Sequence, residues 1–306
     1  MFDHFAWSVV VVPPLIVLLA LLLSDRLAPG PAAVTLAWSA AGAAVAALVN
    51  LALFAVKAVA ELPAIAGLLG WSHDVVARDT AQVPWVSWLS LGWLVLALAA
   101  VSRHRLARRR ALRFVAALAR PPAGQQVVVV ADPAVDAYSI PGSPGRIVVT
   151  SGMRDLLDDE RYAAMLAHER AHLTGRHHRL VELAQLAGAV HPALWWVAGQ
   201  VDYLVERAAD EHAAAAVGSR RVVAHAIGVA AVARGGGRPV ADGLHIAVRP
   251  GVVPRRVAAL LRPRARRIPA WMRLLPATLA LSSLVWTGEA AYDLLELLHA
   301  ARLSRP

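Results

Sequence analysis

The chain has 306 residues, of which 58% are hydrophobic, and it contains no cysteine. Because an ordinary soluble domain is about 45–50% apolar, this composition argues against a simple soluble protein. The lack of cysteine excludes a disulfide framework, a cysteine nucleophile and a zinc site with thiolate ligands. The formal net charge of +10 is concentrated beside hydrophobic stretches, which fits membrane topology better than a nucleic-acid-binding surface.

Four stretches are long and apolar enough to cross a bilayer, which takes about 20 residues. They cover about residues 5–23, 32–56, 83–101 and 274–291. The first contains Pro13 and Pro14, which membrane helices tolerate, and we expect a kink there. A cleavable signal peptide is the alternative for this stretch. Its start, however, contains Asp3 and no Lys or Arg, whereas a signal peptide needs a basic start.

Basic residues near the spans predict the orientation of the chain. Arginines from Arg103 to Arg113 follow the third span, and arginines from Arg262 to Arg273 precede the fourth. Both groups flank the same long segment, which we therefore expect in the cytoplasm, with the N-terminus outside. The prediction is a multi-pass protein of the plasma membrane with three regions. These are residues 1–101 with three transmembrane helices, the cytoplasmic domain 102–273, and residues 274–306 with the fourth helix and a short tail.

The predicted cytoplasmic domain begins with strands and continues with helices. Apolar runs at 125–131 and 146–150 flank a turn-rich segment and predict two strands. Cap residues and breakers then predict four helices. They run from Asp158 or Asp159 to Leu173, over 179–190, over 193–217, and from Pro254 to Leu261. Glycines 235–237 predict a loop between the last two.

The strongest chemical motif is His-Glu-Arg-Ala-His at residues 168–172, an H-E-x-x-H pattern within a predicted helix. Residues four apart share one helix face, so the imidazoles of His168 and His172 can converge on one Zn²⁺ ion. Glu169 lies beside them and is suited to take a proton from the attacking water and deliver it to the leaving amine. The alternative reading of the pattern alone is a solvated helix face with two unrelated histidines.

A catalytic zinc ion takes three protein ligands and keeps one position open. Glu206 is one option for the third ligand, with Asp210, four residues on, accepting a hydrogen bond from a ligand histidine. His178 is the other option, because residues 168–178 match H-E-x-x-H-x-x-G-x-x-H. That class also needs a methionine turn, and the later methionine, Met272, lies at the predicted membrane edge. We therefore favour Glu206.

His168–His172 followed by Glu206-x-x-x-Asp210 resembles the membrane metallopeptidases of the BlaR/MecR antirepressor family and the related HtpX/CAAX-protease type. The segments 147–152 and 191–196 add to the resemblance, as does a domain placed between the third and fourth of four spans. The resemblance covers essentially the whole chain. It implies a mainly α membrane protein with four transmembrane helices and a cytoplasmic α+β zincin-like (gluzincin) protease domain.

The same resemblance implies roles for individual residues. His168, His172 and Glu206 would be zinc ligands, Glu169 the general base, and Asp210 the partner that orients a ligand histidine. Strand 146–150 would then be a sheet edge to which an extended substrate adds, or else an internal strand. An oxyanion stabiliser is expected beside the zinc ion, with candidates Tyr203, His177 and His212. His225 and His245 are expected to be surface or core histidines.

Two features depart from the family. The β-lactam sensors carry an extra C-terminal penicillin-binding domain, whereas here only a short tail follows the last predicted span. Arg170 also stands where a hydrophobic residue often lies in H-E-x-x-H helices. The resemblance therefore extends to the peptidase core and not to β-lactam sensing.

The sequence thus predicts a membrane-anchored zinc endopeptidase that hydrolyses a protein or peptide substrate. If the antirepressor analogy holds, that substrate is a transcriptional repressor. The predicted partners are this substrate and the lipid bilayer, with no direct nucleic-acid contact. Two other classes compete with this prediction. One is a membrane scaffold with a vestigial site, and the other is a DNA- or lipid-binding protein that acts through its basic flanks.

Overall fold

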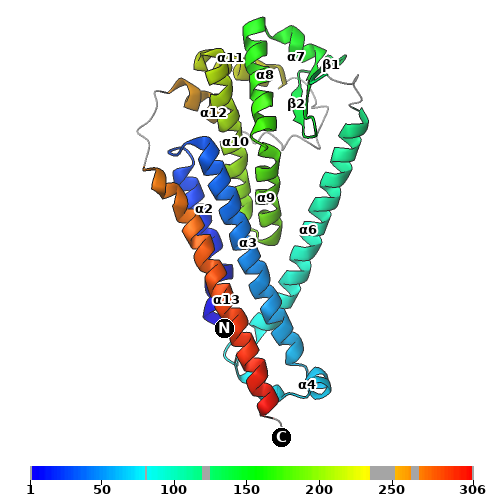
Figure 1. Cartoon of the computed structure of the whole chain (residues 1–306), viewed down its shortest axis with the longest axis vertical. Coiled ribbons are helices and arrows are strands. Elements are labelled where there is room, and N and C mark those ends of the chain that lie inside the picture. The colour runs from blue at the N-terminus through cyan, green and yellow to red at the C-terminus, as the bar shows by residue number, and fades with distance from the viewer. Residues whose placement is uncertain (1, 80, 119–124, 235–251, 263–268, 305–306) are drawn as a thin grey trace.

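The computed structural model describes residues 2–79, 81–118, 125–234, 252–262 and 269–304. Three predicted features lie outside these residues: the 235–237 loop, His245, and the arginines at 264, 266 and 267. Within them the molecule is elongated. A bundle of long helices forms one end, and a smaller group of helices and strands forms the other (Figure 1).

The long helices coincide with the first three predicted spans. A continuous helical stretch combines α1 (Phe2–Phe5), the π-helical η1 (Ala6–Val11) and α2 (Val12–Leu23), and it is followed by α3 (Pro29–Ala60) and α6 (Trp85–Leu118). Among the described residues, three segments are long and apolar enough to cross a membrane: Phe2–Leu23, Pro29–Ala60 and Trp85–Arg113. They suggest association with a lipid bilayer.

The irregularity expected at Pro13 and Pro14 takes the form of a π-helix. The prolines supply no N–H, so the turn before them cannot complete its ordinary hydrogen-bond ladder. The π-helix η1 occupies this turn, immediately before the prolines. The loop after α3 contains two short helices, α4 (Pro63–Leu69) and α5 (His73–Arg78), at the end of the molecule away from the strands (Figure 1).

The fourth predicted span lies in α13 (Leu275–Leu303), which follows the 3-10 helix η2 (Ala270–Leu274). It runs alongside α3 (Figure 1), and Asn50 of α3 donates a 2.7 Å hydrogen bond to the hydroxyl of Thr287. Its length is sufficient, but Ser282, Ser283 and Glu289 make it more polar than the three candidate spans. The fourth crossing therefore stays a prediction.

Three strands form one sheet in the described part of the chain: β1 (Val127–Val130), β2 (Ala137–Ile140) and β3 (Arg146–Thr150). Their order is β1-β3-β2, with β1 parallel and β2 antiparallel to β3. The predicted strands are confirmed, but β2 was not predicted. The edge alternative for 146–150 is wrong, because β3 is paired on both sides and is buried from Ile147 to Thr150.

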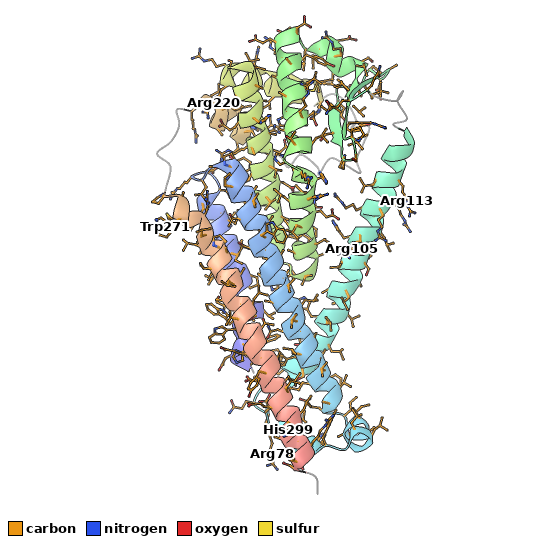
Figure 2. The ribbon with its side chains drawn as sticks, in the orientation of Figure 1. Arg78, Arg105, Arg113, Arg220, Trp271 and His299 are labelled. Atoms are coloured by element: carbon orange, nitrogen blue, oxygen red, sulfur yellow. The ribbon has the colours of Figure 1, made fainter. Side chains whose placement is uncertain are left out.

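The helices of this end begin with α7 (Ser151–Leu156), α8 (Asp159–Thr174) and α9 (His177–Val190). They continue with α10 (Leu194–Val217), α11 (Arg220–Arg234) and α12 (Val252–Leu261). The helices predicted near α8, α9, α10 and α12 are confirmed within two residues at each end, whereas α7 and α11 were not predicted. The basic residues after the third predicted span continue its helix as the upper half of α6, where Figure 2 places Arg105 and Arg113.

Candidate active site

Helix α8 presents the H-E-x-x-H motif. Asp158 caps the helix by accepting a 2.9 Å hydrogen bond from the backbone N–H of Arg161, which satisfies one of the free donors of the first turn. The helix ends at Gly175, as expected. Between these ends His168 and His172 lie on one face, with their ring centroids 4.8 Å apart.

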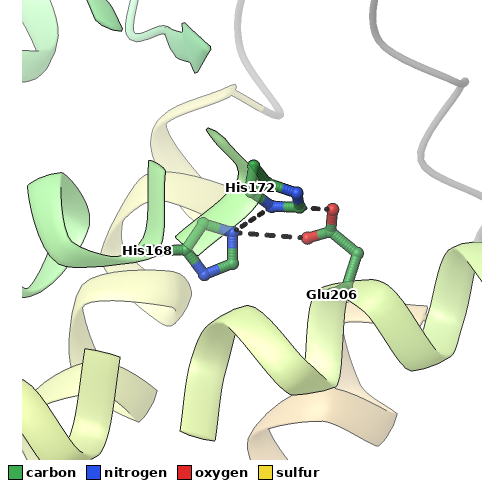
Figure 3. Close-up of side chains that lie close together, drawn as sticks. All are labelled: His168, His172 and Glu206. Atoms are coloured by element: carbon green, nitrogen blue, oxygen red, sulfur yellow. Dashed lines mark hydrogen bonds and ion pairs between the residues drawn. The ribbon is translucent and has the colours of Figure 1, made fainter. Parts of the chain in front are cut away.

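Small residues bring α10 against that face. Alanines of both helices share one buried cluster: Ala164 and Ala167 on α8 and Ala213 on α10. Because an alanine projects little beyond the backbone, two helices that meet through alanines can approach closely. The close approach brings Glu206 of α10 to the histidines of α8 (Figure 3).

The three side chains form a compact cluster of possible metal ligands. The Nε2 atoms of His168 and His172 are 3.1 Å apart. Oε2 of Glu206 is 3.5 Å from Nε2 of His168, and Oε1 is 3.4 Å from Nε2 of His172. Tetrahedral ligands at 2.0–2.1 Å from a zinc ion are separated by roughly 3.3 Å. The cluster therefore has the chemistry and the spacing that a zinc ion requires.

Hydrogen-bonding partners hold both histidine rings. Nδ1 of His168 lies 3.0 Å from Oδ1 of Asp210, which is 2% exposed. Nδ1 of His172 lies 3.1 Å from Nδ1 of His177. With these outer nitrogens engaged, both rings direct Nε2 toward Glu206, as a metal site needs. Gly175 makes room for this arrangement, because a Cβ there would lie 2.5 Å from the His177 ring.

Arg256 of α12 lies at the site, although no sequence pattern predicted a role for it. Its guanidinium donates bidentate hydrogen bonds of 2.7 and 2.9 Å to Asp210. Its Nη1 also lies 2.7 Å from Oε2 of Glu206. The sequence places this arginine in a short helix about fifty residues beyond Glu206, with no spacing rule that relates it to the histidines.

These contacts set the protonation states of the metal-free site. Burial opposes the charge on His168, but the hydrogen bonds with Asp210 and Glu206 outweigh it and raise its pKa to about 10. Burial lowers the pKa of His172 to about 3 and that of His177 to about 4. Burial raises the pKa of Glu206, but Arg256 and His172 outweigh it and hold that pKa well below its usual range.

Glu169 projects from α8 next to His168 and is 9% exposed. It lines a cavity of about 740 Å³ together with the metal-ligand cluster. The cavity also touches Ala137, Tyr138 and Ser139 of β2 and His104 and Arg108 of α6. One concave space thus joins the acid, the histidines, an edge strand and the helix that leads into the third candidate span.

The remaining predicted residues are less central. His178 lines the cavity but does not belong to the ligand cluster found among the described residues. The hydroxyl of Tyr203 donates a 2.7 Å hydrogen bond to Asp25, so it is directed at the loop after α2. His212 and His225 are exposed, so of the two expected settings, surface or core, His225 has the surface one.

The site has the features of a metallopeptidase site: two histidines and a carboxylate within metal-binding distance, a neighbouring glutamate and a substrate-sized cavity. Residues 102–238, a little less than half of the chain, match the family model described as Peptidase family M48. The match supports the M48 metallopeptidase family, which implies a zinc-dependent enzyme with a protein substrate. No match was found among curated proteins or among solved structures.

Proposed function

We propose that this protein is a membrane-anchored zinc endopeptidase of the BlaR/MecR type that cleaves a protein close to the membrane surface. The observation that supports it best is the cluster of His168, His172 and Glu206, whose donor atoms all lie within 4.8 Å of one another. The match to family M48 supports the chemistry. The predicted location is the plasma membrane with the peptidase domain in the cytoplasm, and the fourth crossing is α13.

In this proposal His168, His172 and Glu206 hold the zinc ion. Asp210 accepts a hydrogen bond from the Nδ1–H of His168, and the neutral His177 accepts one from His172, so both ligands keep the tautomer that leaves Nε2 free. When bound, zinc supplies Lewis-acid activation of the attacking water and of the substrate carbonyl.

Glu169 carries the proton transfers. Its carboxylate accepts a proton from the attacking water, and the resulting acid donates that proton to the nitrogen of the departing amine. The burial of Glu169 supports this role, since a carboxylate in a partly closed cavity exchanges protons with its neighbours in preference to bulk water.

The substrate lies along β2 in this proposal. Among the described residues β2 pairs with β3 alone and so is an edge strand, and its residues Ala137 to Ser139 line the cavity that contains Glu169. An extended peptide can therefore hydrogen-bond to the backbone of β2 while its scissile bond reaches the histidines. In this proposal β2, and not the strand at 146–150, is the sheet edge to which the substrate adds. A transcriptional repressor is one such substrate under the antirepressor analogy.

The test compares Glu206→Gln with His178→Gln in the full-length protein purified in detergent. We expect Glu206→Gln to lose bound zinc and peptide hydrolysis, while His178→Gln retains both. Zinc is measured by elemental analysis and hydrolysis with an unfolded protein substrate. Loss of zinc in His178→Gln alone would overturn the ligand assignment. Zinc binding without hydrolysis in the unmodified protein would favour the scaffold alternative.

A further inference from the structure

The helical hairpin of α9 and α10 lies beside the candidate membrane spans for much of its length. In Figure 1 it descends from the strand-bearing end between α3 and α6. Its buried apolar residues share one core with α2 and α3. Members of this core on the hairpin are Val181, Ala184, Ala187, Val190, Leu194, Val197 and Val201, and members on the spans include Val12, Ile16, Ala20, Leu36 and Ala40.

We infer that the tip of this hairpin, Val190–Trp196, enters the hydrocarbon layer of the membrane as a re-entrant element. The inference rests on α2, α3 and α6 lying in the bilayer, as the proposed function requires. The occupant of the exposed side of the tip is then lipid acyl chain.

A hydrogen bond from His191 to the first span carries the inference. An α-helical or π-helical bond to the carbonyl of Val9 would come from the N–H of Pro13 or Pro14, and proline has none. Nε2 of the buried His191 donates a 2.9 Å hydrogen bond to this carbonyl. A free carbonyl in hydrocarbon is costly, and another protein element must satisfy it where no water is present. His191 does so from the hairpin tip.

A side chain of the third candidate span in turn satisfies a backbone carbonyl of the hairpin. Val190 is the last residue of α9, so its carbonyl lacks a partner within that helix. Nε1 of Trp93, on α6, donates a 3.2 Å hydrogen bond to it. Two polar groups of the hairpin turn, Nε2 of His191 and the carbonyl of Val190, are therefore paired with the candidate membrane helices.

Helix geometry places the tip near the middle of the bilayer. Tyr203 of α10 is bonded to Asp25, which follows the end of the first span. Leu194 precedes Tyr203 by nine residues on the same helix, which is ~14 Å at 1.5 Å per residue. Trp93 precedes Arg103 by ten residues on α6, or ~15 Å. Both estimates equal about half of the ~30 Å hydrocarbon thickness.

The composition of the hairpin fits this depth. Residues 183–201 contain no Asp, Glu, Lys or Arg, whereas Glu182 and Asp202 flank them. At the tip Trp195 is 43% exposed and Trp196 is 62% exposed. Exposure of these two indole rings to water would be unfavourable, whereas in lipid the rings are surrounded by acyl chains. The metal-ligand cluster, one helical turn above Tyr203, then lies at the membrane surface.

The absence of cysteine from the chain permits a direct test with single introduced cysteines. Trp196→Cys reports on the tip, Ala216→Cys on the exposed upper half of the same helix, and Leu96→Cys on the exposed face of α6. Each full-length variant is placed in phosphatidylcholine nanodiscs, in which both membrane faces meet water. Labelling by a charged maleimide and quenching of an attached fluorophore by nitroxide-labelled acyl chains are then measured.

We expect Trp196→Cys to behave like Leu96→Cys, with labelling at least about tenfold slower than at Ala216→Cys, because a charged reagent does not enter hydrocarbon. Acyl-chain nitroxides should quench the fluorophore at both slow sites. Fast labelling at Trp196→Cys with slow labelling at Leu96→Cys would overturn the re-entrant hairpin alone. Fast labelling at Leu96→Cys as well would overturn the membrane anchoring on which it rests.

Discussion

Nη1 of Arg256 lies 2.7 Å from Oε2 of Glu206, and the same guanidinium binds Asp210 through two hydrogen bonds. One cation from α12 thus holds both carboxylates that α10 presents to the histidines. Because each carboxylate also contacts His168, the arginine fixes the geometry of the cluster before any metal binds. The arrangement makes α12 part of the site rather than a peripheral helix.

The first prediction concerns this arginine. Arg256→Met leaves the buried Asp210 without its strongest partner, and removing one member of a buried ion pair costs about 3–5 kcal/mol. We expect a clear fall in the thermal stability of the metal-free protein, with partial recovery on adding zinc. We also expect a 10–100-fold loss of zinc affinity or activity, typical for a residue that orients a metal ligand.

Arg255→Met is the matched control. Arg255 is the neighbouring residue on the same helix, and its guanidinium pairs with Asp25 in a more exposed setting. Exposed pairs contribute about 0–1 kcal/mol, so this variant should lie close to the unmodified protein. Equal losses in the two variants would contradict a specific role for Arg256.

The second prediction isolates proton transfer from metal binding. Glu169→Gln keeps the size of the side chain but cannot accept a proton. We expect bound zinc to stay near one equivalent and the turnover rate to fall by about 10²–10⁴, the usual contribution of a general base. Glu160→Gln, an exposed position on the same helix, should leave both quantities unchanged. Loss of zinc from Glu169→Gln would mean that Glu169 has a structural role instead.

The third prediction is the release of a proton when zinc binds. The pKa of His168 is raised to about 10 and that of His172 is lowered to about 3. In the metal-free protein at neutral pH, His168 is therefore charged and His172 neutral. Zinc binds neutral imidazole, so the proton of His168 must leave. Affinity should rise about tenfold per pH unit between neutrality and pH ~10.

Calorimetry in two buffers with different ionisation enthalpies measures this proton directly. Asp210→Asn removes a partner that raises the pKa of His168 and should reduce the release at neutral pH. The stability of the metal-free fold depends on pH in the opposite direction, because it falls as pH rises. The charged His168 contributes its full stabilisation below its ordinary pKa near 6.5, and this contribution is lost as pH rises through about 10. A zinc affinity independent of pH would contradict the assignment.

The fourth prediction tests the packing of the α9–α10 hairpin. A Cβ at Gly188 would lie 2.9 Å from the indole of Trp195, so Gly188→Ala should force the two helices apart. Overpacking of this kind costs about 1–3 kcal/mol. No described residue lies within 4 Å of where a Cβ on Gly228 of α11 would sit, so Gly228→Ala should stabilise by up to about 1 kcal/mol. Thermal unfolding in detergent measures both, and a stable Gly188→Ala would contradict close packing there.

Local pattern was enough to predict the elements that carry the clustered histidines and Glu206. The apolar stretches, the strand at 146–150 and the helices of the motif and of Glu206 follow from periodicity and caps, which act over a few residues. The pairing of His168 with His172 follows as well, because four residues on a helix define one face. The choice of Glu206 over His178 rested on the missing methionine turn, together with a family resemblance.

Contacts between distant segments were decided only by the tertiary structure. Arg256 reaches Asp210 because α12 folds back across α10, and no local rule connects residues so far apart in the chain. The strand 146–150 is internal because an unpredicted strand, Ala137–Ile140, pairs along its second side. His191 meets Val9 for a similar reason: the prolines leave a carbonyl without a donor, but only the folded hairpin brings the donor to it. Periodicity reports which face of a segment is apolar, whereas the partner of that face depends on the packing of the whole chain.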